Sequence, residues 1–256
     1  MKKVVLLAGP GGTTDIVANY LAARVPELDV IVEDPPSRIR MATRRAARVG
    51  WPTVIGQVLF VTTALPLLRR WGRHRIDEIA DQADLDDTPW VGARHVASVN
   101  APDVVAMLRR ADPALVVVNG TRIISAEVLD AVDCQFVNTH AGITPRYRGV
   151  HGGYWALAEG HPELVGTTVH LVDEGIDTGG VLARAAFRPA PDDSIATYPY
   201  LHLAAGLPLL ATQVERVLGG QPLVPVTEEV PPGGTRLYLH PTLWQYFWCR
   251  LADGVR

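Results

Sequence analysis

Residues 112–140 read DPALVVVNGTRIISAEVLDAVDCQFVNTH, and this stretch decides the fold. Residues 114–118 form an apolar run that is typical of a fully buried β-strand. Residues 125–132 predict a short helix, and residues 134–137 predict a second strand. Strands that are joined through a helix lie parallel in one sheet. We therefore expect working residues at the carboxyl ends of these strands, where parallel sheets hold their ligands.

The same alternation of strands and helices extends to both sides of this stretch. Toward the N-terminus we expect strands over 3–7, 28–32 and 95–100 and helices over 15–25 and 101–111. The fold class is therefore α/β, with a doubly wound, mostly parallel sheet. We divide the chain into a catalytic domain, residues 1–185, and a short C-terminal extension, residues 186–256. The extension begins with a helix over 201–218, and we expect its aromatic residues to pack back on the core.

Charge and cysteine content narrow the classes of function. The 256 residues include 24 Lys and Arg against 27 Asp and Glu, and this balance disfavours a protein that grips nucleic acid through phosphates. The basic residues 38–48 predict a solvated helix face. Cys134 and Cys249 follow no metal-ligand spacing and are expected as free thiols. The N-terminal apolar run breaks at Gly9, which predicts a strand rather than a secretion signal, so we expect a cytoplasmic protein.

One apolar stretch, residues 54–68 (VIGQVLFVTTALPLL), has no obvious place in this sheet. It is shorter than the roughly 20 residues that a membrane-spanning helix needs. It also contains Gln57 and Pro66. We expect a buried helix, or one packed over the sheet. Peripheral membrane contact stays open as the less favoured alternative, because arginines flank the stretch on both sides.

The candidate chemistry lies directly after the strand that ends near residue 137. Asn138 and His140 are two positions apart, so their side chains point the same way if the strand continues. An amide can donate to a developing oxyanion, and an imidazole can move a proton near neutral pH. This pair is suited to acyl transfer to an amine. Alone, an Asn-x-His triplet is more often structural.

The residues around this pair form a more specific pattern. Pro145, Arg148 and Gly149 follow it, then residues 166–170 (GTTVH) and 173–179 (DEGIDTG). The pattern resembles the formyltransferase family, which includes phosphoribosylglycinamide, methionyl-tRNA and nucleotide-sugar N-formyltransferases. The resemblance implies a Rossmann-like core and 10-formyltetrahydrofolate as formyl donor. It implies that Asn138 polarises the formyl carbonyl, that His140 assists proton transfer, and that Asp177 orients His140. A carboxylate beside the imidazole is expected to raise its pKa and select its tautomer.

The resemblance also implies where the donor rests. In this family the pteridine lies against two loops, which here contain Gly120, Thr121, Arg122, Ile123 and Ile124 and then Asp173, Glu174, Gly175 and Ile176. We expect backbone groups to bind the pteridine edge and the two isoleucines to pack on its face. The family's Pro-Ser-Leu-Leu-Pro after the histidine is here residues 141–145, AGITP. This departure bears on the shape of the loop and the choice of acceptor.

Residues that would contact the acceptor are expected in two places: Gly11, Gly12, Thr13 and Thr14, and Tyr147, Arg148 and His151. The glycine-rich turn is either an anion-binding nest or a simple tight turn, and a dinucleotide site is disfavoured because Thr14 replaces its third glycine. For His151 two positions stay equally open: it faces the acceptor, or it is a surface residue at the N-terminus of a helix. His170 is expected to be a packed or half-exposed strand residue. The histidines match no metal-site spacing, so no metal is expected.

Together these observations predict formyl transfer from 10-formyltetrahydrofolate to the amine of a small molecule. The stretch over 147–153 most resembles small enzymes that formylate an amino sugar on a nucleotide carrier. A phosphoribosylglycinamide-type amine, an amino acid or a hydroxylamine are the next choices. Hydrolysis of formyl-folate and a plain nucleotide-binding module stay open as alternatives. No nucleic-acid partner is expected, and a homodimer through the apolar C-terminal segment also stays open.

Overall fold

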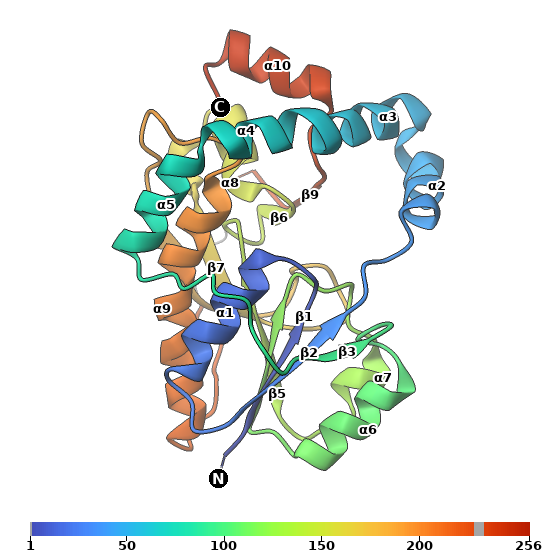
Figure 1. Ribbon diagram of the computed structural model, residues 1–256, viewed down its shortest axis with the longest axis vertical. Coiled ribbons are helices and arrows are strands. Elements are labelled where there is room, and N and C mark those ends of the chain that lie inside the picture. Colours follow the sequence, from blue (N-terminus) through green and yellow to red (C-terminus); the bar gives the residue numbers. More distant parts are fainter. Residues whose placement is uncertain (1, 228–232) are drawn as a thin grey trace.

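A computed structural model describes residues 2–227 and 233–256, apart from the side chain of Arg40 (Figure 1). Within these residues the main sheet has seven strands in the order β3-β2-β1-β4-β5-β7-β8. The first five pair in parallel, β7 pairs antiparallel with β5, and β8 pairs antiparallel with β7. The strands are β1 (Val4–Ala8), β2 (Leu28–Glu33), β3 (Arg94–Val96), β4 (Leu115–Asn119), β5 (Gln135–His140), β7 (Gly166–Leu171) and β8 (Val181–Ala186). The predicted α/β class with a mostly parallel, doubly wound sheet is confirmed.

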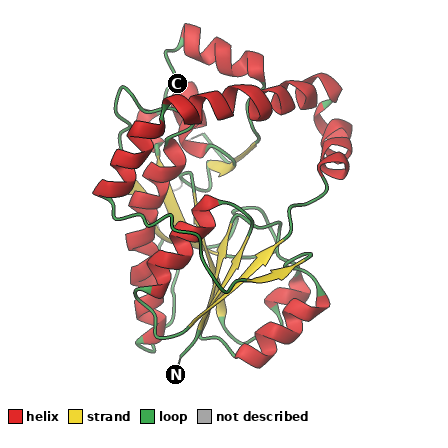
Figure 2. Ribbon diagram, in the orientation of Figure 1, coloured by secondary structure: helices red, strands yellow, loops and turns green. Residues whose placement is uncertain are grey.

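Helices cover both faces of this sheet, as Figure 2 shows. One face packs on α1 (Gly12–Ala22) and α9 (Tyr198–Leu218), and the other packs on α6 (Pro102–Ala111) and α7 (Ala126–Leu129). Successive residues of β1 alternate between these two layers: Val4 and Leu6 belong to the first, Val5 and Leu7 to the second. Because both faces are buried, the central strands are continuous apolar runs. Two further helices are α5 (Arg73–Gln82) and the short η2 (Pro162–Leu164).

A second, two-stranded sheet lies beside the main one. Its strands are β6 (Tyr147–Gly149) and β9 (Arg236–Tyr238), which pair in parallel although almost ninety residues separate them in sequence. The helix α8 (Gly152–Ala158) follows β6 and packs on it through Ala156 and Trp155. The C-terminal part of the chain therefore returns to the segment that follows β5. The division at residue 185 stays a proposal, and residues 228–232 of the extension lie outside the described residues.

A helical arm precedes the third strand. It consists of α2 (Arg38–Val49), α3 (Trp51–Leu59), the π-helical turn η1 (Phe60–Ala64) and α4 (Leu65–Trp71). Pro66 has no N–H to donate to the carbonyl four residues earlier, so the chain passes through a wider turn before it. By length and composition the helix over residues 51–71 could cross a membrane, but one third of its most apolar window is buried against the protein.

Two packing predictions were wrong. The helix over 54–68 was expected to be buried or packed over the sheet, yet Ile55, Val58 and Leu67 are exposed and one narrow side alone packs inward, against η1 and α10 rather than the sheet. The C-terminal aromatics were expected to pack on the core, yet in α10 (Leu243–Ala252) Tyr246 is buried while Trp248 is 71% exposed. The physical reason is that the two helices pack on each other and on α8 through small contact areas, which leave their other sides without a neighbour.

Candidate active site

The end of β5 presents the predicted amide and imidazole. The strand runs to His140, three residues beyond its predicted end, and pairs with β7 so that Asn138 lies opposite His170. The alternation of side chains along a strand then places Asn138 and His140 on one face. This is the carboxyl edge of the parallel part of the sheet, where such folds hold their ligands.

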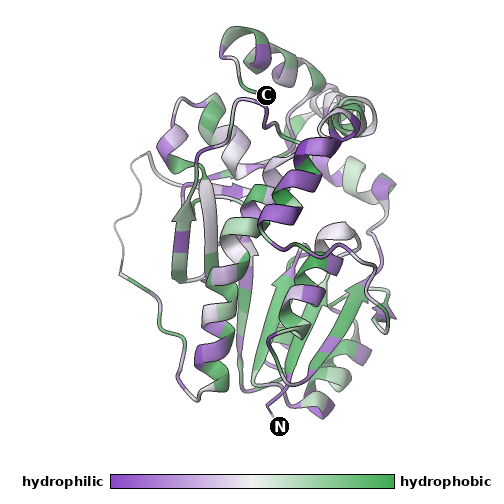
Figure 3. Cartoon of the chain, turned by 60° about the vertical axis from the view of Figure 1, so that its left-hand side comes forward, coloured by the Kyte–Doolittle hydropathy of each residue, from purple (hydrophilic) through white to green (hydrophobic). Residues whose placement is uncertain are grey.

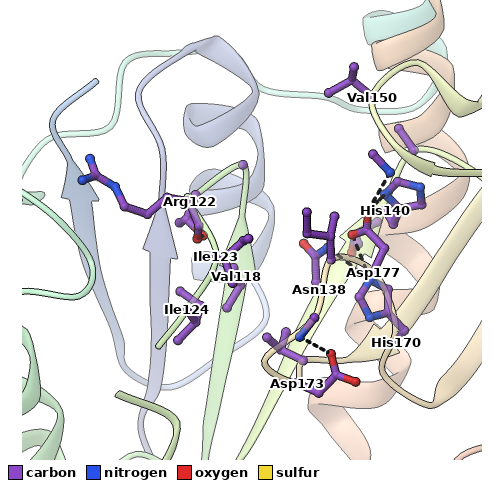
Figure 4. Close-up of a pocket in the computed structure, with 18 residues that line it drawn as sticks. Val118, Arg122, Ile123, Ile124, Asn138, His140, Val150, His170, Asp173 and Asp177 are labelled. Carbon is purple, nitrogen blue, oxygen red and sulfur yellow. Dashed lines mark hydrogen bonds and ion pairs between the residues drawn. The ribbon is translucent and has the colours of Figure 1, made fainter. Parts of the chain in front are cut away.

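A cavity of about 360 Å³ opens at this edge (Figure 4). The loop after β4 forms one wall, with Arg122, Ile123 and Ile124, and the loop after β7 together with Asn138, His140 and Asp177 forms the other. Its volume lies in the range of sites for small organic ligands. The structure thus brings together three predicted residues from distant parts of the chain on one wall of one cavity.

Three short contacts hold His140 and Asp177 in place. The His140 Nδ1 lies 3.3 Å from Asp177 Oδ2, and the His140 Nε2 lies 2.7 Å from the carbonyl oxygen of Tyr147. The backbone N–H of Gly149 donates to Asp177 Oδ2 at 2.8 Å. Both ring nitrogens of His140 therefore face oxygen acceptors. Since a neutral imidazole can donate from one nitrogen alone, the imidazolium form satisfies both contacts.

Burial opposes this arrangement. His140 is 5% exposed, and burial lowers its pKa below the ordinary value, outweighing the Asp177 carboxylate and the Tyr147 carbonyl, which raise it. The Asp177 carboxylate acts on the pKa of His140 in the expected direction, but desolvation is larger than this attraction, so the net shift is downward. Burial also acts to raise the pKa of Asp177, but His170, His140 and the Gly149 N–H together hold it below its ordinary value. Near neutral pH the pair is a neutral imidazole beside a carboxylate.

The contact between His140 and the Tyr147 carbonyl depends on a glycine. A Cβ at Gly142 would lie 2.5 Å from the Tyr147 carbonyl oxygen and 2.8 Å from His140 Nε2. Any side chain would therefore separate the two groups. Gly142 is one of the positions in which residues 141–145 depart from the family's usual proline-rich run, and here its small size shapes the histidine's surroundings.

One residue of the site was not predicted. His170, expected to be a packed or half-exposed strand residue, is 3% exposed and lines the cavity. Its Nδ1 donates to the Leu171 carbonyl at 2.7 Å, so in the neutral ring Nε2 accepts from Asn138 Nδ2, 3.2 Å away. The same nitrogen lies 3.6 Å from Asp177 Oδ1. The signal that could have indicated this role was the pairing of β5 with β7, which sequence alone does not give.

A buried acid supports the loop over 120–124, the first of the two loops predicted to contact the formyl donor. Glu33, 2% exposed, accepts the backbone N–H of Arg122 at 2.7 Å and that of Val99 at 3.1 Å, and it forms an ion pair with the Arg122 guanidinium. Asn100 donates to the Ile123 carbonyl at 2.8 Å. Neither Glu33 nor Asn100 was predicted as a support of this loop.

The side chains of the donor loops divide between the core and the cavity. Ile123 is 52% exposed on the cavity wall, whereas Ile124 is buried in the layer of α6 and α7 and contributes a smaller part of the wall. Gly120 and Thr121 also line the cavity, as do Asp173, Gly175 and Ile176 of the second loop. The remaining predicted residue, Glu174, is exposed and does not belong to the lining.

The glycine-rich turn lies next to the first donor loop rather than in the cavity. The Gly9 N–H donates to the Asn119 carbonyl, and the Thr14 hydroxyl donates to the Gly9 carbonyl at 2.6 Å. Gly11, Gly12, Thr13 and Thr14 therefore form the start of α1 beside the loop over 119–121. Their predicted contact with the acceptor stays a prediction.

Two predicted acceptor residues point elsewhere. Tyr147 is fully buried, and its hydroxyl donates to Glu159, so its carbonyl alone reaches the site. His151 contacts His240 at 2.9 Å, and burial lowers its pKa to about 3. Arg148 lies in β6 and is not part of the cavity lining, which its neighbours Gly149 and Val150 form instead. Within the described ranges, no cluster of three His, Cys, Asp or Glu side chains is placed to hold a metal ion.

Comparisons with known proteins agree with this geometry. Residues 73–202 match the family model described as formyl transferase. A methionyl-tRNA formyltransferase of Anaeromyxobacter dehalogenans is 31% identical over 219 residues, which cover 78% of this chain and 69% of that protein. A second, from Anaeromyxobacter sp. strain K, is also 31% identical, and there the match covers 61% of the relative's length.

Solved structures show the same fold at lower identity. A sugar N-formyltransferase from Shewanella sp. is 16% identical with a TM-score of 0.55, covering 90% of this chain and 75% of that one. The phosphoribosylglycinamide formyltransferase of Streptococcus pneumoniae is 20% identical with a TM-score of 0.55, covering 85% of this chain and 99% of that one. From its family match and its relatives, the chain belongs to the formyltransferase family.

Proposed function

We propose that the chain transfers a formyl group from 10-formyltetrahydrofolate to the amine of a small molecule. The observation that carries the proposal is the convergence of Asn138, His140 and Asp177 on one cavity wall, opposite the loop over 120–124. An amino sugar on a nucleotide carrier is the first acceptor to test. Free thiols at Cys134 and Cys249 support a reducing, cytoplasmic setting as part of the proposal.

The residues of the cavity fit a folate donor. Ile123 exposes an apolar side chain toward the cavity, and Val118 and Val172 add to an apolar lining suited to a flat ring. The backbone of residues 120–122 offers hydrogen-bonding groups at the same wall. The donor would supply the formyl carbon: its bond to N10 of the folate breaks as the acceptor nitrogen bonds to that carbon, and the proton that the amine loses goes to N10.

The protein's own groups would divide this chemistry among themselves. Asn138 gives one N–H to His170 Nε2, and its second N–H is free to donate to the oxygen that becomes negative during transfer. His140, which burial keeps neutral, can take up the amine's proton on Nε2 once this nitrogen turns from the Tyr147 carbonyl to the acceptor. Asp177, 3.3 Å away, stabilises the imidazolium that results. Before transfer, the Tyr147 carbonyl fixes the orientation of the His140 ring, and the Gly149 N–H fixes that of the Asp177 carboxylate.

The test is a panel of candidate amines incubated with 10-formyltetrahydrofolate and the full chain. The panel includes nucleotide-linked amino sugars, glycinamide ribonucleotide, amino acids, hydroxylamines and methionyl-tRNA, the last because of the names of the relatives. Release of tetrahydrofolate together with a formyl mass gain on one small amine supports the proposal. Formate release without any amine would indicate a hydrolase. Formylation of methionyl-tRNA alone would contradict the small-molecule acceptor.

A further inference from the structure

The distribution of charge along this chain is strongly uneven. Residues 35–76 contain nine arginines and no aspartate or glutamate. Since the whole chain carries a formal charge of −3, the other 214 residues carry −12. This basic segment coincides with the helical arm from α2 to the start of α5. A separation of this size orients a protein toward an anionic surface.

Several of these arginines form no ion pair within the part of the chain that the structure describes. Arg75 pairs with Asp193 and Glu78, and Arg45 contacts Gln57. In contrast, across residues 2–227 and 233–256 no ion pair is formed by five others, which lie on α2 and α4: Arg38, Arg44, Arg48, Arg69 and Arg70. Their charges are free to meet an external anion.

Two neighbouring helices beside these arginines leave apolar stripes exposed. On α3 the stripe is Trp51, Ile55 and Val58, with Trp51 55% exposed. On α10 it is Trp244, Phe247, Trp248 and Leu251, with Leu251 85% exposed. Both sets follow the spacing of one helix side, opposite the buried Phe60 and Tyr246. Helices with one apolar side and basic neighbours lie in the interface of a membrane.

The two helices are adjacent and lie at one end of the molecule. The Trp244 ring lies so close to Gly56 that a Cβ there would approach it to 2.3 Å. Figures 1 and 3 both place α10 and the arm at the end opposite the N-terminus, and Figure 3 shows apolar residues on α10 at that end. The active-site cavity, in contrast, is formed by the strand ends of the main sheet.

We propose that the exposed stripes of α3 and α10, with the arginines of α2 and α4, bind the surface of an anionic lipid membrane. The helix over 51–71 lies in the interface rather than across it, because Val54, Phe60 and Leu65 pack inward and Gln57 donates to the His240 carbonyl. Crossing the bilayer would expose that side. Tryptophans at both ends of this helix, Trp51 and Trp71, suit the headgroup region.

A second copy of the chain is a poorer occupant of this surface than lipid. Most homodimers are two-fold symmetric, so the same patch of both copies meets itself. That symmetry would bring two arginine-rich arms together, since they flank the stripes, with no acid in either segment to compensate. An anionic membrane supplies the opposite charge along its whole surface.

Vesicle flotation with the full chain tests the proposal. The chain should bind vesicles of phosphatidylcholine with an equal part of phosphatidylglycerol at least tenfold more tightly than phosphatidylcholine alone. Each arginine near an anionic bilayer typically strengthens binding about fivefold. Exchanging Arg38, Arg44 and Arg48 together for glutamine should therefore weaken binding to anionic vesicles at least tenfold. The double exchange of Trp248→Ser and Leu251→Ser should weaken it by a similar factor.

Matched controls come from exposed residues outside the arm and α10. Arg109→Gln with Arg110→Gln on α6, and Val91→Ser in the loop before β3, remove the same kinds of exposed side chain and should leave binding within twofold. Thermal unfolding checks that each variant is folded. Absence of vesicle binding by the unaltered chain, equal binding to both vesicle types, or a dimer in sedimentation that Trp248→Ser with Leu251→Ser makes monomeric would overturn the proposal. The assay requires no formyl donor or acceptor, so its outcome is independent of the proposed activity.

Discussion

Replacing Asp177 with asparagine tests the central pair of the site. Over the 3.3 Å between Asp177 Oδ2 and His140 Nδ1, a carboxylate and an imidazolium attract each other by about 5 kcal/mol at an effective dielectric constant near 20. The amide oxygen of asparagine still accepts the Gly149 N–H and can accept from His140 Nδ1–H, which retains about 1 kcal/mol of the interaction with His140 as a hydrogen bond. The remaining loss of about 4 kcal/mol corresponds to roughly a 10³-fold lower kcat.

The assay is steady-state formation of tetrahydrofolate with the best acceptor of the panel, together with calorimetric binding of a non-transferable folate analogue. Because asparagine conserves the shape of the loop, affinity for the analogue should change less than threefold. Asp173→Asn is the matched control: Asp173 lies in the same loop and lines the cavity, but its carboxylate contacts Gly175 N–H and Thr178 and no histidine. Its kcat should stay within threefold. A kcat for Asp177→Asn within tenfold of the unaltered chain would refute the assigned role.

Three further substitutions test other residues of the structure. Asn138→Ala should lower kcat by about 10²–10³, the typical effect of losing one oxyanion donor, while analogue affinity stays within threefold; equal losses in both would indicate a binding role. Glu33→Gln removes the ion pair with Arg122 but keeps an acceptor for the loop, so KM for the donor should rise about tenfold at nearly constant kcat, measured by donor titration. Burial lowers the pKa of His202 to about 3 from an unfolded value near 6.5, so its share of stability is present above pH 6.5 and is lost as pH falls below that value. Between pH 7 and pH 5 the unaltered chain should lose about 2 kcal/mol more free energy of unfolding than His202→Gln in urea titrations; parallel losses would contradict this assignment.

The strands of the core could be predicted from sequence because their signals are local, and the proposed catalytic trio could be predicted from a motif pattern that resembles the formyltransferase family. The apolar runs of β1, β2 and β4 have no other stable place than a sheet covered on both faces. Asn138 and His140 stand at the end of such a run, and Asp177 belongs to the motif over residues 173–179. Each of these inferences needed no knowledge of which strands are neighbours.

Other parts of the site depend on pairing and burial, which the sequence does not display. The role of His170 arises from the antiparallel register of β7 against β5. The lowered pKa of His140 results from how completely it is enclosed. Glu33 supports a loop that lies 89 positions further along the chain. Apolar composition likewise predicted burial for Trp248, because hydrophobicity states what a side chain prefers and not whether a neighbour covers it.

The pairing of β6 with β9 connects the C-terminal helix α10 to the candidate active site. The Val150 N–H donates to the Tyr238 carbonyl, and the adjacent Gly149 donates to Asp177. Five residues after Tyr238 the chain enters α10. Deleting the segment from residue 236 onward would strip β6 of its hydrogen-bonded neighbour and leave the carboxylate's backbone donor on an unsupported edge. A short segment of chain and two backbone hydrogen bonds thus connect α10 to Asp177, so a contact made by α10 can affect the position of this carboxylate.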